Sequence, residues 1–203
     1  MNKKLSALLF LLFALSNISC SVYQTLVNVS RLQFKLGTVN NLEINSVAVQ
    51  GKNSLKDFSA IDIFKLSSAV ARKSFPVSFT LNVDAKNPND GTGGYAKTNL
   101  TLSHFNWRLF IDDKETVSGD LEQPMIVPGT GETTIIPIQV NIDLVKFFGN
   151  RGLESLINLA LSISGNQGSS SNIALYVRPT VSSPLGDIQY PQEIKIISKQ
   201  FTN

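Results

Sequence analysis

Residues 77–86, with the sequence VSFTLNVDAK, alternate between apolar and polar side chains without interruption. Successive side chains of a β-strand point to opposite faces of the sheet, so this alternation predicts a half-buried strand. The next residues, 87–91, read NPNDG, and all five favour turns. A strand of this kind followed at once by a turn is typical of a mainly β protein.

Further strands are expected on both sides of this one, because the same alternation recurs between turn residues. They are predicted at residues 32–50, 99–111, 115–118, 125–127, 136–142, 173–177 and 193–198. A phase shift near Ser103 and His104 predicts a bulge in the strand over 99–111. Residues 178–192 contain three prolines and predict a loop or a sheet edge, since proline lacks a backbone donor.

Two segments change to helical spacing, with apolar residues every three or four positions. The first covers residues 60–72, with Ser59 where an N-cap would stand. The second covers residues 144–163 and is interrupted at 149–150 by Gly and Asn. With no internal repeat and no linker, 203 residues predict one domain, over residues 32–203, built as a sandwich or a barrel.

The first twenty residues have the layout of a secretory signal peptide over residues 1–19. Lys3 and Lys4 give a positive start, and residues 5–15 are apolar apart from Ser6. This run is shorter than the roughly 20 residues that a membrane-spanning helix needs. We therefore expect a cleaved signal rather than a permanent span.

Cys20 is the single cysteine of the chain and directly follows this segment. It resembles the lipidated cysteine of the bacterial lipobox, with Ser19 as the small residue before it, although Asn17 replaces the usual leucine. The alternative is a cleaved signal with an incidental cysteine. The resemblance implies acylation of Cys20, a lipidated tether over residues 20–31, and acyl chains that partner the membrane. The absence of aspartate after Cys20 implies the outer membrane, with the domain facing the periplasm.

The stretch from Phe79 to Asn89 resembles the late embryogenesis abundant type 2 family, also called the water-stress and hypersensitive-response domain. In that family an alternating strand ends in Asn-Pro-Asn, as it does here at Asn87, Pro88 and Asn89. The resemblance covers residues 32–198 and points to a bacterial lipoprotein branch. It implies a fibronectin-III/immunoglobulin-like antiparallel β-sandwich with one or two accessory helices, and a structural role for the three motif residues.

Charge and composition exclude several classes of function. Without Lys3 and Lys4 the formal net charge falls from +3 to +1, and no basic stripe for nucleic acid is present. His104 is the single histidine, so we expect neither a catalytic triad nor a zinc site. In the turn after Lys86, an EF-hand alignment would place that lysine at the first calcium ligand, and no metal or cofactor is expected.

Two functions remain from the sequence. The first is a non-enzymatic, lipid-anchored protein of the cell envelope that acts as an interaction or stress-protection module. The alternative is a periplasmic carrier for an apolar or glycan ligand, because sandwiches with helices can open a cavity between layers. Neither hypothesis identifies the envelope protein or ligand that would be the partner.

Overall fold

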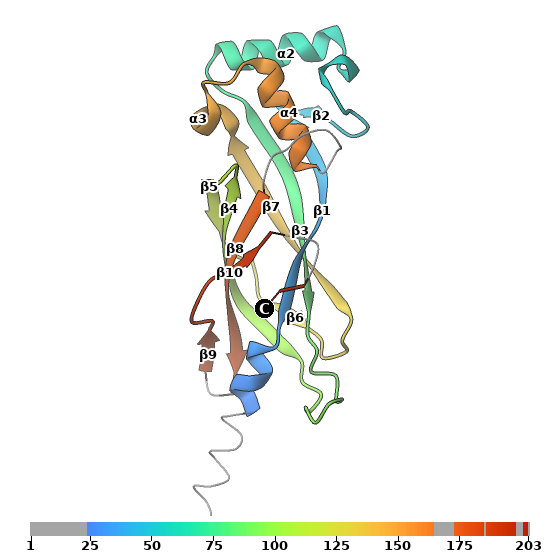
Figure 1. The fold of residues 1–203 in the computed structure, drawn as a ribbon, viewed down its shortest axis with the longest axis vertical. Coiled ribbons are helices and arrows are strands. Elements are labelled where there is room, and N and C mark those ends of the chain that lie inside the picture. Colours follow the sequence, from blue (N-terminus) through green and yellow to red (C-terminus); the bar gives the residue numbers. More distant parts are fainter. Residues whose placement is uncertain (1–23, 165–172, 185, 198–200, 203) are drawn as a thin grey trace, which may run out of the picture.

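The computed structural model describes residues 24–164, 173–184, 186–197 and 201–202, and it shows two antiparallel sheets packed together (Figure 1). The first sheet has four strands in the order β2-β1-β3-β7. Their bounds are Gln33–Ile44 for β1, Val47–Ala48 for β2, Pro76–Lys86 for β3 and Thr133–Asp143 for β7. The prediction of a mainly β protein is confirmed, and Cys20 lies outside the described residues.

The second sheet is built on two long central strands, β4 and β8, and each carries two short strands on its outer side. The long strands are Leu100–Ile111 for β4 and Ile173–Ser183 for β8. The short strands are Lys114–Gly119 for β5, Met125–Val127 for β6, Gly186–Gln189 for β9 and Ile194–Ile196 for β10. Short edge strands limit the length of unpaired backbone that another chain could pair with.

The core lies between the sheets and follows the alternation of β3. Its buried residues are Val77, Phe79, Leu81, Val83 and Ala85. From the first sheet, Phe34 contacts Phe105 of the second, with ring centroids 5.3 Å apart and the rings tilted by 51°. Both phenylalanines are fully buried, and each stabilises the fold by about 1.5–3 kcal/mol.

The predicted bulge in β4 is confirmed, and a tight turn follows this strand. Asp112 and Asp113 form a two-residue hairpin loop between β4 and β5, with φ values of 48° and 59°. Positive φ at both central residues suits the twist of the flanking strands. The register between β4 and β8 shifts between Leu102 and His104, where the phase of the sequence changes.

The prediction of a loop or sheet edge directly after Val177 is wrong, because β8 continues through Pro179 to Ser183 between β4 and its outer neighbours. Pro179 accepts a hydrogen bond from the amide of Tyr190 at 2.9 Å. The N and O atoms of one strand residue point to the same side, so the nitrogen of Pro179 points away from β4. The missing donor therefore costs no hydrogen bond with the central strand.

The helices outnumber the one or two that we expected. They are η1 at Leu55–Asp57, α2 at Ala60–Ala71, α3 at Leu144–Phe148, α4 at Leu153–Ile163 and a further helix over residues 24–30. The helical segment is interrupted between α3 and α4 at Gly149 and Asn150, as predicted. Ser59 caps α2 as predicted, since its hydroxyl accepts from the amide of Asp62 at 3.1 Å. Among the described helices, none is both long and apolar enough to cross a membrane.

The sandwich is elongated, and its two ends differ (Figure 1). We call the end with helix 24–30 and the loops over 87–99 and 128–132 the loop end. The opposite end carries α2, α3 and α4, and we call it the helix end.

Candidate functional site

The structure places the predicted motif residues at the loop end, directly after β3, where Asn87 and Asn89 are both completely buried. The amide nitrogen Nδ2 of Asn87 donates to the carbonyl oxygens of Thr98 at 2.8 Å and Val127 at 2.9 Å. Its Oδ1 accepts from the backbone N of Asn89 at 3.2 Å and from Nδ2 of Asn89 at 2.8 Å. Asn87 therefore joins three separate segments through one side chain.

Asn89 extends this network to the N-terminal helix. Its Nδ2 also donates to the carbonyl oxygen of Asn28 at 2.8 Å, and its Oδ1 accepts from Nη1 of Arg31 at 2.9 Å. The guanidinium of Arg31 lies 3.6 Å from the ring centroid of Tyr95, which is a cation–π contact. The network of Asn87, Asn89 and Arg31, which we call the asparagine node, fixes helix 24–30 to the loops.

The node leaves no room for a ligand at its centre. Gly129 packs so close that an added Cβ would lie 2.4 Å from the carbonyl oxygen of Asn89 and 2.5 Å from that of Thr98. All amide nitrogen and oxygen atoms of Asn87 and Asn89 have partners within the protein. Buried and satisfied amides of this kind specify a structure rather than bind a ligand.

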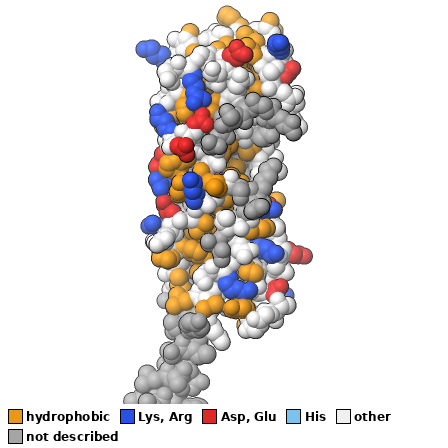
Figure 2. Space-filling view, in the orientation of Figure 1, with side chains coloured by type: hydrophobic (Ala, Val, Ile, Leu, Met, Phe, Trp, Pro, Cys, Tyr) orange, Lys and Arg blue, Asp and Glu red, His pale blue; other side chains and the backbone are white. Residues whose placement is uncertain are grey.

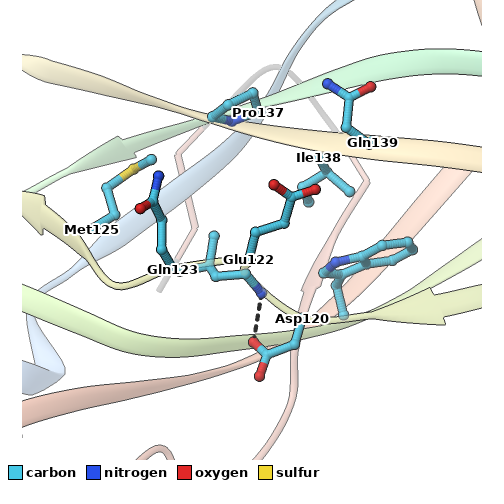
Figure 3. Close-up of a pocket in the computed structure, with 9 residues that line it drawn as sticks. Asp120, Glu122, Gln123, Met125, Pro137, Ile138 and Gln139 are labelled. Atoms are coloured by element: carbon cyan, nitrogen blue, oxygen red, sulfur yellow. Dashed lines mark hydrogen bonds between the residues drawn. The ribbon is translucent and has the colours of Figure 1, made fainter.

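A small cleft of about 180 Å³ opens where the edge strand β7 passes the end of β5 (Figure 3). Its lining residues are Trp107, Asp120, Leu121, Glu122, Gln123, Met125, Pro137, Ile138 and Gln139. Trp107 packs directly on the backbone of Gly119, where an added Cβ would lie 2.5 Å from Cζ2 of the indole. The glycine thus lets the indole lie against the strand that leads into the cleft.

Asp120 organises the wall of the cleft. Its Oδ1 accepts from the backbone amides of Phe105 at 2.6 Å and Leu121 at 2.7 Å, the second of which is drawn in Figure 3. Its Oδ2 lies 2.7 Å from Nδ1 of His104. Partial burial raises the pKa of Asp120, but the hydrogen bonds from His104, Phe105 and Leu121 outweigh it, so the pKa is lowered. The carboxylate is therefore ionised at neutral pH.

The pair of His104 and Asp120 supplies two of the three groups that a nucleophilic triad requires. The adjacent hydroxyl of Ser103 is directed elsewhere, since it donates to the carbonyl oxygen of Thr180 and to Asp187, each at 3.3 Å. Within the described ranges, no group of three or more His, Cys, Asp or Glu side chains could hold a metal ion. The arrangement can orient a proton and accept hydrogen bonds from a polar ligand.

The cleft residues were not identified from the sequence. Asp120 and Gln123 follow β5 in an irregular segment, and Gln139 lies on the outer face of β7, so none of them belongs to a motif. One indirect signal was available, because Pro137 interrupts an alternating strand and proline inside a strand indicates a sheet edge. His104, by contrast, was singled out in the sequence and lies beside this cleft.

Comparison with known proteins leaves the family open. No family model matches the chain, and no curated protein matches it. A crystal structure of a protein from Archaeoglobus fulgidus is similar, with a TM-score of 0.32 and 10% sequence identity over 82% of this chain and 99% of that one. A likeness of this size identifies no function, and the similarity to the late embryogenesis abundant type 2 family stays a prediction.

Proposed function

We propose that the protein is a non-enzymatic lipoprotein of the cell envelope, anchored through acylated Cys20, that acts as an interaction or stress-protection module. The observation that supports this proposal is the rigid attachment of helix 24–30 to the loop end. A lipid anchor positions a domain only when the chain between the two is short, and helix 24–30, which begins four residues after Cys20, is bonded to the rest of the domain.

Several contacts attach the helix. Val29 is buried, with 3% of its surface exposed, and its carbonyl oxygen accepts a hydrogen bond from the hydroxyl of Tyr190. Burial raises the pKa of Tyr190, so the hydroxyl remains a donor at all physiological pH values. Asn28 and Arg31 add their hydrogen bonds to Asn89. These contacts come from the loops that follow β3 and β9, one in each sheet, and they attach the helix to both layers.

Three residues, 21–23, separate Cys20 from the first described helical residue, Gln24. Even fully extended, the four Cα–Cα steps from Cys20 to Gln24 span only about 14 Å. Acyl chains on Cys20 would therefore hold the loop end close to the bilayer and point the helix end away from it. The outer membrane and a periplasm-facing domain remain part of this proposal, as does the fibronectin-III/immunoglobulin-like assignment of the sandwich.

Metabolic labelling with radioactive palmitate tests the anchor. We expect label in the full-length chain, loss of label in Cys20→Ser, and release of that variant from the membrane fraction. Ser21→Ala is the matched control, because it changes the neighbouring residue and leaves the thiol. Label that persists in Cys20→Ser, or an unlabelled and soluble wild-type chain, would refute the proposal.

The non-enzymatic part is tested separately with a panel of esterase, amidase and glycosidase substrates. We expect no turnover above the background of the buffer. Turnover that disappears in His104→Ala and in Asp120→Asn would assign catalysis to this pair and contradict the proposal.

A second candidate function is a carrier for a short glycan, and the cleft beside Asp120 favours it. An indole, carboxylates and amides together suit a sugar, which offers an apolar face and hydroxyl groups. Titration of neutral oligosaccharides into labelled protein should then shift the amide signals of Gln139 and Gln123. The shifts should weaken in Gln139→Ala and persist in Asn141→Ala, an exposed change on the same strand. Unchanged spectra would exclude this candidate.

A further inference from the structure

Two bulky apolar side chains stand out on the surface of the helix end. On α2, Ile61 is 70% exposed and Phe64 is 73% exposed. With 3.6 residues per turn, these two residues share one outward stripe with Ser68 and Arg72. The opposite face of the helix, with Leu66 and Ala69, is buried in the domain. Neither exposed side chain contributes to the core.

Positive charge is concentrated around this stripe. Residues 52–73 contain five Lys or Arg residues and two Asp residues, whereas the rest of the chain after residue 19 contains eleven basic and thirteen acidic residues. All the net positive charge beyond residue 19 therefore belongs to η1, α2 and their flanks. Figure 2 shows hydrophobic side chains at this end of the molecule with Lys or Arg on either side.

The two acidic residues of this region are committed to helix caps. Asp57 accepts hydrogen bonds from the backbone amides of Asn53 at 2.8 Å and Ser54 at 2.9 Å. Asp62 accepts from the hydroxyl of Ser59 at 2.8 Å and from its amide at 3.3 Å. Lys52 and Lys65 contribute to the lowered pKa of Asp62, but among the described residues no ion pair within 4.0 Å joins Asp57 or Asp62 to Lys65 or Arg72. Lys65 and Arg72 are thus available to an external anion.

A shallow apolar groove that is largely open to solvent lies beside the stripe. It is lined by Leu55, Lys56, Phe58, Ala60 and Ile63. The groove widens the apolar surface next to Ile61 and keeps a lysine at its rim. Exposed apolar side chains bordered by lysine and arginine are the composition of helices that lie in a membrane interface.

We propose that the helix end docks on an anionic bilayer, with Ile61 and Phe64 among the lipid chains and Lys65 and Arg72 at the phosphates. Anionic lipids attract each basic residue near the surface, and the exposed apolar side chains leave water on insertion. A second copy of this chain fits less well, because two such surfaces would bring like charges together. With the anchor proposed above, the domain would connect two membranes, and this last step rests on that proposal.

Vesicle capture tests the docking. The full-length chain is reconstituted into phosphatidylcholine vesicles, and labelled acceptor vesicles of phosphatidylcholine, with or without phosphatidylglycerol, are added. We expect capture of the anionic acceptors only, and less capture as salt is raised. The double variant Lys65→Gln/Arg72→Gln should reduce capture about 30-fold, because each basic residue contributes about 1 kcal/mol at an anionic surface.

The double variant Ile61→Ser/Phe64→Ser should reduce capture at least about 10-fold while the fold persists, since both side chains lie outside the core. A matched control changes two exposed apolar residues elsewhere on the surface. Ile126→Ser/Ile135→Ser replaces apolar side chains that are 58% and 56% exposed, and it should leave capture unchanged. Circular dichroism of each variant confirms that the comparison is made between folded proteins.

Equal capture of neutral and anionic acceptors, or full capture by both stripe variants, would overturn the docking. Capture that requires the chain on the acceptor vesicles as well would assign the stripe to self-association and would also overturn it. If the wild-type chain fails to float with the neutral donor vesicles, the anchor is wrong. Flotation of the free chain with anionic against neutral vesicles then tests the docking by itself.

Discussion

At the loop end, two completely buried asparagines are held by directed hydrogen bonds, whereas at the helix end α4 is held by apolar side chains. Seven of the residues of α4 are buried, from Leu156 to Ile163, and one of these, Ser162, is polar. At the asparagine node, Asn87 and Asn89 connect four segments of the chain through side-chain amides. The two ends therefore use different forces for the same task of closing a sandwich.

The difference determines what each end can do. Apolar burial scales with area and has no preferred direction, so it stabilises strongly but fixes position only through packing. Buried hydrogen bonds add less net free energy, but they require one geometry. The loop end is accordingly suited to hold the chain that leads to Cys20 in one orientation. The helix end is suited to carry a surface helix whose outward face is not needed for the core.

The largest loss of stability is expected when a buried apolar side chain at the helix end is shortened. Leu156 of α4 is completely buried, and Leu156→Ala should lower the free energy of unfolding by about 3 kcal/mol through lost burial and a residual cavity. Urea denaturation followed by far-UV circular dichroism measures the change. Ile61→Ala on α2 is the control, since its exposed side chain should change stability by less than about 0.5 kcal/mol. Equal losses in the two variants would contradict the assignment of α4 to the core.

A smaller loss is expected at the asparagine node. Asn87→Ala removes both donors to the carbonyl oxygens of Thr98 and Val127 and leaves the backbone amide of Asn89 without its acceptor. Because buried polar groups without partners are destabilising, the free energy of unfolding should fall by about 2 kcal/mol. Asn106→Ala changes an exposed asparagine of β4 and should be neutral within about 0.5 kcal/mol. A neutral Asn87→Ala would show that the node is dispensable.

The hydrogen bond between Tyr190 and Val29 at the loop end tests whether the position of helix 24–30 can be changed without loss of the whole fold. Tyr190→Phe removes the hydroxyl that donates to Val29 and should cost about 1 kcal/mol. The loss should be local, with faster hydrogen exchange of the amides in helix 24–30 and unchanged exchange in α4. Tyr176→Phe, a matched change on the outer face of β8, should leave the exchange of helix 24–30 unchanged. Faster exchange throughout the sheets would show that the helix is part of the global unfolding unit.

The elements that could be predicted from sequence are those in which local chemistry and burial agree. Residues 77–86 alternate because one face of β3 is buried, and α2 begins directly after Ser59 because the hydroxyl there accepts from the backbone amide of Asp62. The bulge at His104 was visible as a change of phase. Each of these signals lies within a few residues and needs no knowledge of the partner strand.

The rest depends on distant partners that periodicity does not encode. Pro179 lies inside a sheet because its nitrogen faces away from β4, and only the pairing reveals this. The motif at 87–89 was recognised from sequence, but its bonds to Asn28 and Arg31 span about sixty residues. The cleft at Asp120 arises from two sheet edges that meet in space. The burial of Asn87 and Asn89 could not be predicted from sequence either, since Asn is mostly a surface residue.

The smallest effect is expected at Asp120, whose polar cluster is only partly buried. Comparison with Asn87 tests whether burial determines how much such hydrogen bonds contribute to the free energy of unfolding. Asp120 accepts hydrogen bonds from His104 and two backbone amides, and its pKa is lowered relative to the ordinary value. A folded-state pKa below the unfolded value of about 3.9 stabilises the protein fully above that pH, and the contribution disappears as the pH falls through the folded value. Other carboxyls titrate in the same range, so the informative quantity is the difference in unfolding free energy between wild type and Asp120→Asn. This difference should shrink as the pH falls below about 4, and solvent screening should keep it under about 1 kcal/mol. A pH-dependent difference larger than the loss in Asn87→Ala would show that burial does not set the strength of these clusters.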